Sequence, residues 1–495
     1  MKIYEYLWPY PQELKTGRGS FPFPREIRLT GQLPANLKED LKKIGKFRIT
    51  GGRNAYPLKL KIDRKSARPE GYVLKLSASG ASLAGADKHG LSYGIQTLLQ
   101  LSNLFIKEGV LPELTIRDWP AFKKRCFMVD MGRTVFPMPL LKRIVRILSR
   151  LKMNQLHLHL YDDELCGIRF KGLPFGKENP HAITIAGLKE LIEYAGGYNI
   201  EVIPELEAWG HANSITYHRT DLIGGTGKFG GSSFLICEKT FELMKELMEQ
   251  VIRVMPPEGH IHLGLDEAKW YPGPDLPEGY KPEDMIRRYH DILHGLNRKY
   301  NKKIKMIVWA DSGGRPIPKD IQHNIIIQPW GYWNVRADDI SAKVARYSGK
   351  NKMKWIAGGG QSMGIPRGSF HATRQWCKKA MRSPNIEGVN ITFWGWNDLE
   401  NKFISLFGGA YYLWNPSAKT EFADLEDYED FDSRVFRILF RWQGNFRDAF
   451  PSDIARERGP LVCGGYYYWG NRHLKPYAPT AAAAGTFKGH DYQND

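Results

Sequence analysis

The feature that most constrains this chain is the regular alternation of short apolar segments with amphipathic segments from about residue 121 onward. The apolar segments have the length of buried strands. The amphipathic ones carry apolar residues at helical spacing, as Leu141, Ile144, Val145 and Leu148 do. Such alternation predicts a parallel sheet, and eight units predict a closed (β/α)8 barrel. The expected strands cover residues 126–130, 156–160, 202–205, 260–265, 305–310, 325–327, 354–357 and 389–393.

An open, doubly wound sheet is the structural alternative to a barrel. No Gly-x-Gly-x-x-Gly motif follows the first expected strand, so the usual sign of a dinucleotide site in such a sheet is missing. Two of the barrel helices have threonines suited to cap their first turns, Thr184 and Thr240.

The segment before the barrel has the pattern of a separate small domain. It contains two strand-like stretches and one helical stretch, at residues 72–76, 81–86 and 90–104, and it ends at Asp118-Trp119-Pro120. The fold class is therefore α/β, a (β/α)8 TIM barrel preceded by a small α+β domain. We predict an N-terminal α+β accessory domain at 1–117, the catalytic barrel at 118–440 and a partly irregular C-terminal extension at 441–495.

Composition excludes several classes of protein. No run of 18 apolar residues is present, so a membrane-spanning helix is not expected. The first residues lack a basic stretch followed by an apolar one, which favours a cytoplasmic location over secretion. The five cysteines are scattered without a Cys-x-x-Cys pair, so neither a disulfide framework nor a structural metal site is predicted.

The formal net charge of +18 raises the question of an anionic partner. Lysines and arginines are spread along the chain, and runs such as Lys302-Lys303 are short. Solvated surfaces explain this distribution better than a nucleic-acid-binding face does. We therefore expect neither a nucleic-acid nor a membrane partner, and we expect no cofactor.

The expected strand ends are unusually polar, and in such barrels the active site lies at those ends. Carboxylates perform acid and base chemistry, and indoles stack on the apolar faces of sugars, so this combination predicts sugar hydrolysis. The first four strands are followed by Asp130 and Arg133, Asp162 and Asp163, Glu205, Glu207 and His211, and Asp266 and Glu267, and later strands end at Trp309, Trp330, Trp394 and Trp396.

Four motifs, in order and at barrel spacing, resemble glycoside hydrolase family 20, the β-N-acetylhexosaminidases. They are VDMGRTVF, MNQLHLHLYDD, PELEAWGH and HLGLDE, and the earlier EGYVLKL and GLSYGIQTLLQL resemble the accessory domain of that family. The resemblance extends from residue 1 to about 400. It implies an exo-acting retaining enzyme that releases terminal β-linked GlcNAc or GalNAc. In this family the 2-acetamido oxygen of the substrate attacks the anomeric carbon and forms an oxazolinium intermediate.

The resemblance also implies roles for individual side chains. Glu267 would be the general acid and then the base for water, and Asp266 would hold the acetamido N–H and stabilise the oxazolinium charge. The other residues expected to contact or support the sugar are Arg133, for the 3- and 4-hydroxyls, Asp162 and His211, as a pair near the acid, and the aromatic residues Trp309, Trp330, Tyr332, Trp394 and Trp396. Asp130 would orient Arg133. Taken alone, His211 is also explained as a hydrogen-bonded structural histidine, and Arg133 as part of a surface salt bridge.

Several positions depart from the family pattern. Leu265 stands where a second glycine is usual, and Trp396 stands where many members have a glutamate for the 4- or 6-hydroxyl. The usual tyrosine of the seventh strand is missing, and Tyr332 is a candidate replacement. Three alternatives thus stay open: a hexosaminidase specific for 6-substituted, for example sulfated, GlcNAc, a barrel that binds amino sugars without cleaving them, and a polyanion binder. A homodimer is among the expected assembly states.

Overall fold

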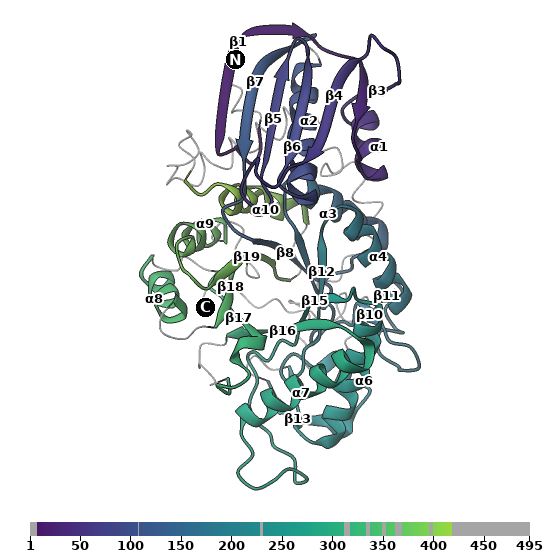
Figure 1. Cartoon of the computed structure of the whole chain (residues 1–495). Coiled ribbons are helices and arrows are strands. Elements are labelled where there is room, and N and C mark those ends of the chain that lie inside the picture. The colour runs from purple at the N-terminus through teal and green to yellow at the C-terminus, as the bar shows by residue number, and fades with distance from the viewer. Residues whose placement is uncertain are drawn as a thin grey trace.

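The computed structural model describes residues 7–106, 108–227, 231–310, 317–332, 337–348, 353–361, 369–395 and 399–417. The chain folds into an N-terminal domain, seen at the top of Figure 1, and a larger barrel domain below it. None of the helices in these ranges is long and apolar enough to cross a bilayer.

The N-terminal domain is a seven-stranded mixed sheet in the order β1-β7-β5-β6-β4-β2-β3. Its buried face consists of alternate strand residues such as Leu58, Leu74 and Leu83, which pack in one apolar cluster with helix residues including Leu98. Among the described helices, none of this domain covers the other face, since α1 and α2 both pack on the leucine side. The elements are β1 (Glu13–Pro22), β2 (Glu26–Thr30), α1 (Ala35–Lys43), β3 (Arg48–Ile49), β4 (Tyr56–Ile62), β5 (Tyr72–Ser77), β6 (Gly80–Gly85), α2 (Lys88–Phe105) and β7 (Val110–Asp118).

The barrel is closed by eight parallel strands that follow one another in sequence order. They are β8 (Lys124–Asp130), β9 (Gln155–His159), β12 (Glu201–Glu205), β15 (Glu258–His262), β16 (Lys303–Ala310), β17 (Ile325–Pro329), β18 (Lys354–Gln361) and β19 (Ile386–Phe393). The prediction of a (β/α)8 barrel preceded by a small domain is therefore confirmed.

Helices follow most of the strands on the outside of the barrel (Figure 1). They are α3 (Met138–Arg150), α4 (Ile185–Gly197), α6 (Glu238–Val254), α7 (Pro282–Tyr300), α8 (Ala337–Ser348), α9 (Ser369–Ala380) and α10 (Leu399–Trp414). Between β16 and β17, the described residues hold only a short 3-10 helix, Gln322–Asn324. Smaller elements lie in the loops that follow β9 and β12. They are β10 (Ile168–Arg169), β11 (Ile183–Thr184), α5 (Asn213–Thr216), the 3-10 helix Thr220–Leu222, β13 (Ile223–Thr226) and β14 (Ser232–Phe234).

Of the two predicted threonine caps, one is confirmed and one is wrong. The predicted end of the fourth barrel strand is also wrong. Thr184 caps α4, accepting a hydrogen bond from the backbone N–H of Gly187 at 3.0 Å. Thr240 does not cap α6, because the helix already begins at Glu238 and the Thr240 hydroxyl donates to the Leu235 carbonyl at 2.5 Å. The fourth barrel strand ends at His262 rather than at residue 265, since Gly264 and Leu265 have φ values of 61° and 73° that no strand accommodates.

The two domains share a buried polar contact. Lys152, at the end of α3, has φ 59° and its ammonium group lies 2.8 Å from the carboxylate of Asp118, the last residue of β7. The same carboxylate accepts hydrogen bonds from the Tyr72 hydroxyl and the Trp414 indole, both at 2.8 Å. Trp414, the last residue of α10, belongs to the apolar cluster of the N-terminal domain.

Candidate active site

The structure brings the sequence-predicted carboxylates together at the C-terminal ends of the first four barrel strands. Arg133 follows β8, and its nitrogens lie 3.0 Å from Asp130, 2.7 Å from Asp162 and 3.3 Å from Glu164. Asp130 also accepts the Gly395 N–H at 2.9 Å, which ties the first strand end to the eighth. Asp130 is therefore placed to orient Arg133, whereas Glu164 was not expected in the site.

These buried carboxylates are held in different protonation states. Burial raises the pKa of Glu164 well above its usual value, against the opposing effect of Arg133. Burial acts on Asp162 in the same direction, but Arg133 and His211 hold the pKa of Asp162 well below its usual range. Arg133 is thus paired with at least one ionised carboxylate and lies beside one that favours its neutral form.

A line of alternating acids and imidazoles runs from the barrel interior to the mouth. His159 Nδ1 lies 2.6 Å from Glu205, and its Nε2 lies 2.7 Å from Asp162. Asp162 in turn lies 3.1 Å from His211 Nδ1. His211 Nε2 is 3.4 Å from Oε2 of Glu267, and 4.0 Å from Oδ2 of Asp266. The sequence-predicted pair of Asp162 and His211 therefore does contact, and it contacts the predicted acid.

The pKa directions along this line follow from the partners. Burial alone would lower the pKa of His159 and of His211, but Glu205 and Asp162 raise the first, and Asp162 raises the second, well above the usual value. Because an ionised carboxylate can only accept hydrogen bonds, both imidazoles donate an N–H hydrogen bond to Asp162. His211 therefore presents Nε2 to Glu267 as a donor.

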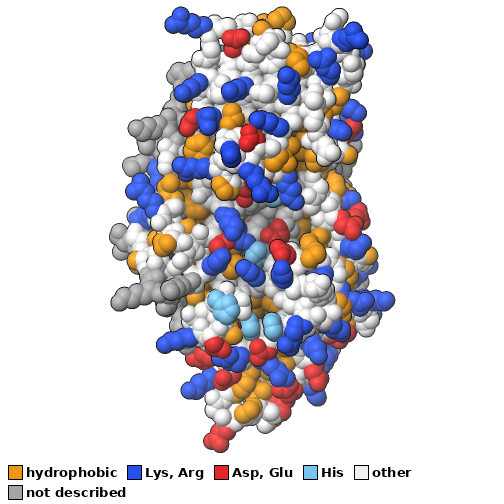
Figure 2. Space-filling model, viewed as in Figure 1, with side chains coloured by type: hydrophobic (Ala, Val, Ile, Leu, Met, Phe, Trp, Pro, Cys, Tyr) orange, Lys and Arg blue, Asp and Glu red, His pale blue; other side chains and the backbone are white. Residues whose placement is uncertain are grey.

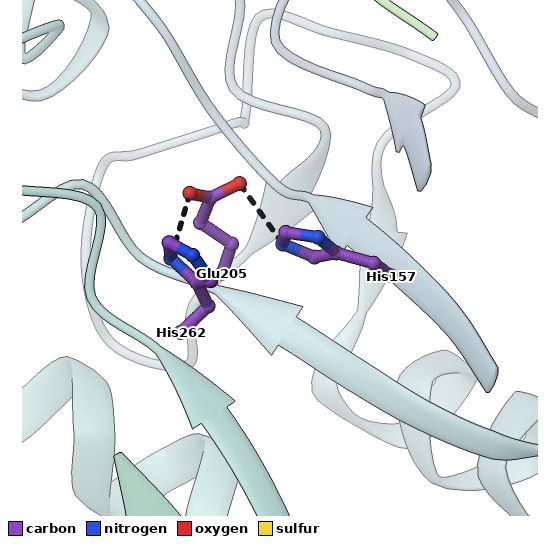
Figure 3. A group of neighbouring side chains, drawn as sticks. All are labelled: His157, Glu205 and His262. Atoms are coloured by element: carbon purple, nitrogen blue, oxygen red, sulfur yellow. Dashed lines mark ion pairs between the residues drawn. The ribbon is translucent and has the colours of Figure 1, made fainter. Parts of the chain in front are cut away.

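Four further residues, His157, His262, Trp309 and Asn390, support this line from the barrel interior. Figure 3 shows the Glu205 carboxylate between His157 and His262, at 3.0 and 2.9 Å. Trp309 donates its indole N–H to the same carboxylate at 2.6 Å, and Asn390 contacts His157 at 2.9 Å. Burial lowers the pKa of His157 to about 4, so this imidazole is neutral near pH 7. The sequence signal for this layer was the alternation of His157 and His159 with leucines in a buried strand.

The catalytic candidates lie on a tight turn rather than on a strand. Gly264 has φ 61°, and a Cβ there would meet the Glu207 carboxylate at 1.9 Å, so any side chain at this position would have to displace that buried group. Glu267 itself has φ 46°. Burial raises the pKa of Asp266 to about 7, aided by Glu267 and opposed by His211. The exposed fractions of the side chains are 16% for Glu267, 12% for His211 and 10% for Asp266, and these are the parts of the line that solvent reaches.

Aromatic rings gather at the ends of β16, β17 and β19, and the Trp394 ring centre lies 5.0 Å from that of His159 in the acid–imidazole line. The Trp309 and Trp394 ring centres are 5.6 Å apart, and Trp330 stacks on Tyr332 at 5.4 Å. Tyr332 lies 6.5 Å from Trp394 with the rings nearly perpendicular, so the candidate tyrosine belongs to this group. The Trp309 indole N–H donates to Glu205, which holds this ring in place beside Trp394. Trp396 lies outside the described residues.

Several groups of these side chains have metal-ligating chemistry. His157, Glu205 and His262 form one such group, and His211, Asp266 and Glu267 form another. In the first group, Trp309 donates to Glu205 and the Gly264 N–H lies 3.0 Å from His262 Nδ1. The Glu205 carboxylate and His262 Nδ1 thus already accept hydrogen bonds, and the group fits an internal support for His159 better than a cation site.

Fold and site together define a (β/α)8 barrel enzyme scaffold with a carboxylate- and indole-lined mouth. The sequence model described as "Glycosyl hydrolase family 20, catalytic domain" matches residues 122–348, and the one described as "Glycosyl hydrolase family 20, domain 2" matches residues 4–119. The two matches together cover more than half of the chain. The chain belongs to glycosyl hydrolase family 20.

Curated relatives carry the name beta-hexosaminidase. The relative from Akkermansia muciniphila is 32% identical over 225 residues, which are 40% of this chain and 45% of that protein. The relative from Porphyromonas gingivalis is 27% identical over 271 residues, 49% of this chain and 34% of that protein. This chain thus spans less than half the length of either protein.

Solved structures share the fold. The chitobiase from Flavobacterium johnsoniae superimposes with a TM-score of 0.72 at 19% identity, covering 99% of this chain and 84% of that one. The likeness therefore extends through both domains.

Proposed function

We propose that this chain is a retaining β-N-acetylhexosaminidase that removes terminal β-linked GlcNAc or GalNAc from glycans by substrate-assisted catalysis. The observation that carries the proposal is the contact between His211 and Glu267 at 3.4 Å, at the solvent-accessible end of a buried acid–imidazole line. A carboxyl group that solvent reaches and an imidazole supports is suited to exchange a proton with a bound glycoside.

Glu267 acts first as the acid and then as the base. It protonates the leaving oxygen, and the imidazolium of His211 stabilises the carboxylate that results. Asp162, held ionised by Arg133 and His211, keeps His211 charged and fixed in orientation. In the second half of the reaction, the same carboxylate takes a proton from water, and the line returns to its starting state.

The arrangement of the carboxyl groups favours an internal nucleophile from the substrate. Asp266 and Glu267 both approach the same nitrogen of His211 and lie on one side of the site, whereas an enzymic nucleophile faces its acid across the sugar. Other carboxylates at the mouth, such as Asp162 and Glu207, are 1% exposed. The 2-acetamido oxygen of the substrate would then attack the anomeric carbon.

Asp266 orients the acetamido group during that attack. As a carboxylate, it accepts the acetamido N–H and stabilises the positive charge of the oxazolinium ion. Its pKa of about 7 means that the empty site holds a mixture of both forms near neutral pH. The developing positive charge of the substrate favours the ionised form, so the group becomes more strongly charged when it is needed.

The decisive experiment compares two matched glycosides. A 4-nitrophenyl β-GlcNAc glycoside should be cleaved, and the corresponding β-glucoside, which lacks the internal nucleophile, should be cleaved negligibly. A thiazoline that mimics the oxazolinium ion should inhibit strongly, because such ligands resemble the transition state. Equal cleavage of both glycosides would assign the nucleophile to the protein and reject substrate assistance. No cleavage of either would reject the hydrolase.

A further inference from the structure

The open face of the N-terminal sheet carries six polar residues in one continuous row. Strand pairing places Lys15 opposite Thr115, Thr115 opposite Lys75, Lys75 opposite Ser82, Ser82 opposite Lys59, and Lys59 opposite Thr30. Lysines and hydroxyl residues therefore alternate across β1, β7, β5, β6, β4 and β2. We call these six residues the lysine row.

The lysine row lies on the face of the sheet that α1 and α2 leave uncovered. Side chains alternate between the two faces along a strand, and the neighbours of Lys59 and Lys75, among them Leu58 and Leu74, are buried against the helices. All three lysines of the row are exposed, and so are Ser82 and Thr30, while Thr115 is half-buried. Figure 2 shows Lys and Arg side chains gathered over this domain at the top of the view.

The lysines of the row have no ion-pair partner in the described parts of the chain, in contrast to basic residues beside them. Arg117, in the neighbouring row, is paired with Glu13 at 4.0 Å, and Lys61 is paired with Asp63 at 2.9 Å. In the described part of this face, the cations without an acidic partner thus include Lys15, Lys59 and Lys75 of the row, together with Arg28, whose guanidinium donates to the Gly52 and Arg53 carbonyls. Two acids lie on this face near β1: Glu13, which is paired with Arg117, and Glu113, whose carboxylate accepts the Ala78 N–H at 3.4 Å.

The spacing of the row is set by the sheet. Adjacent strands lie about 4.8 Å apart, so lysines on every second strand repeat at about 10 Å, roughly the length of a disaccharide. We propose that the lysine row binds an anionic polysaccharide, carboxylated or sulfated, that lies across the strands. Each ammonium group meets one charged sugar, and the hydroxyl between two lysines bonds to the uncharged sugar that separates them.

The chemistry of the row favours a polysaccharide over other polyanions. The row contains no aromatic ring on which a base could stack, and single-stranded nucleic acids are bound largely through such stacking. It contains no large apolar side chain that could enter a lipid bilayer. The flat, hydroxyl-bearing surface is complementary to a ribbon of sugars that alternates charged and neutral units.

This proposal is independent of the catalytic proposal, because its residues lie in the other domain. Strand pairing brings together charges that are dispersed in the sequence. Lys15, Lys59 and Lys75 are far apart in the sequence, but strand pairing brings them into one line, where a single extended polyanion can contact all three.

The test compares two full-length variants with the same loss of net charge. One carries Lys15→Gln, Lys59→Gln and Lys75→Gln, and the control carries Lys171→Gln, Lys177→Gln and Lys245→Gln, three exposed lysines of the barrel domain. Binding is measured by calorimetry with dextran sulfate and with polygalacturonate, with neutral dextran as the uncharged probe. Double-stranded DNA and phosphatidylserine vesicles are measured alongside. Hydrolysis of a small chromogenic glycoside and the melting temperature show whether each variant is folded.

We expect the wild type and the control to bind both anionic polysaccharides, with affinity that falls as salt rises, and neutral dextran not to bind. The row variant should bind about tenfold more weakly, the order expected for three exposed ion pairs, with its glycoside hydrolysis unchanged. Equal losses in the two variants would overturn the proposal, because net charge alone would then explain binding. It would also be overturned if DNA or vesicles bound through the same three lysines as tightly as the polysaccharides did.

Discussion

The Nε2 atom of His211 lies 3.4 Å from Oε2 of Glu267. This contact joins the only part of the acid–imidazole line that solvent reaches to a buried chain of partners ending at Glu205. A proton that leaves Glu267 therefore does so beside an imidazolium that Asp162 holds in place. Each of the following predictions perturbs one part of that arrangement.

The change Glu267→Gln keeps the shape of the side chain and removes the transferable proton. The kcat/KM for an unactivated GlcNAc disaccharide should fall by about 100-fold or more, the usual scale of general acid catalysis. An aryl glycoside with a good leaving group should be affected less, since it needs less protonation. The ratio of the two losses is the measurement, and near wild-type turnover of the disaccharide would show that Glu267 is not the acid.

The change Asp162→Asn tests the partner of His211. Asp162 raises the pKa of His211, so the variant should lose the imidazolium at lower pH. The alkaline limb of the kcat profile should move to lower pH by about one unit. Glu164→Gln is the matched control, because Glu164 is a buried carboxyl that contacts Arg133 and should leave the limb in place. An alkaline limb that is the same in both variants would exclude the proposed coupling.

The change Asp266→Asn should stabilise the fold in a pH-dependent way. The pKa of Asp266 rises from 3.8 to about 7 on folding, so the folded state binds more protons than the unfolded state between those values. The stability of the wild type therefore falls as the pH rises through this window, by up to a few kcal/mol. The variant lacks this loss, and its advantage in melting temperature should grow from pH 4 to pH 7 and then level off.

The control for that measurement is Asp291→Asn, on the exposed side of α7. Its melting temperature should follow the wild type across the same range. If the advantage of Asp266→Asn were constant with pH, or were largest at low pH, the raised pKa would be wrong.

The change Gly264→Ala tests whether close packing requires a glycine in the turn that holds Asp266 and Glu267. A Cβ at this position meets the Glu207 carboxylate at 1.9 Å, and φ is 61°. At Gly279 φ is 80°, but a Cβ would have no neighbour within 4 Å, so Gly279→Ala has only the backbone strain. Gly279→Ala should cost about 1 kcal/mol. Gly264→Ala should cost clearly more in the free energy of unfolding and should abolish hydrolysis, and equal costs would contradict the packing.

Much of the barrel was predictable because its strands are buried on both sides. Such strands appear as continuous apolar runs, and the helices between them have one apolar face, as α3 does. The N-terminal sheet was harder. In β1, nearly every residue is exposed and two glycines interrupt the pattern, so the segment has no alternation that a sequence could reveal.

The sequence predicted which residues form the site, but not all of the contacts between them. Motif spacing placed Arg133, Asp162, His211, Asp266 and Glu267 at neighbouring strand ends, which the structure shows. It did not reveal that Glu164 lies against Arg133, because Glu164 follows two acidic residues and resembles a surface turn. It also extended the fourth strand too far, since Leu265 is a good strand residue whose φ of 73° is imposed by the turn around it.

The position of Trp414 has a consequence for the order of events during synthesis. Its indole lies in the core of the N-terminal domain and donates to Asp118, although nearly 300 residues separate the two in the sequence. The N-terminal domain leaves the ribosome before the barrel does, and it therefore lacks part of its own interior until the last described helix has been made. A nascent chain paused within the barrel would expose an incomplete apolar core and an Asp118 that lacks its indole donor, and exposed apolar surface is a feature that chaperones and proteases recognise. Truncation before α10 should therefore damage both domains, and the accessory domain is a poor candidate for transplantation onto another enzyme.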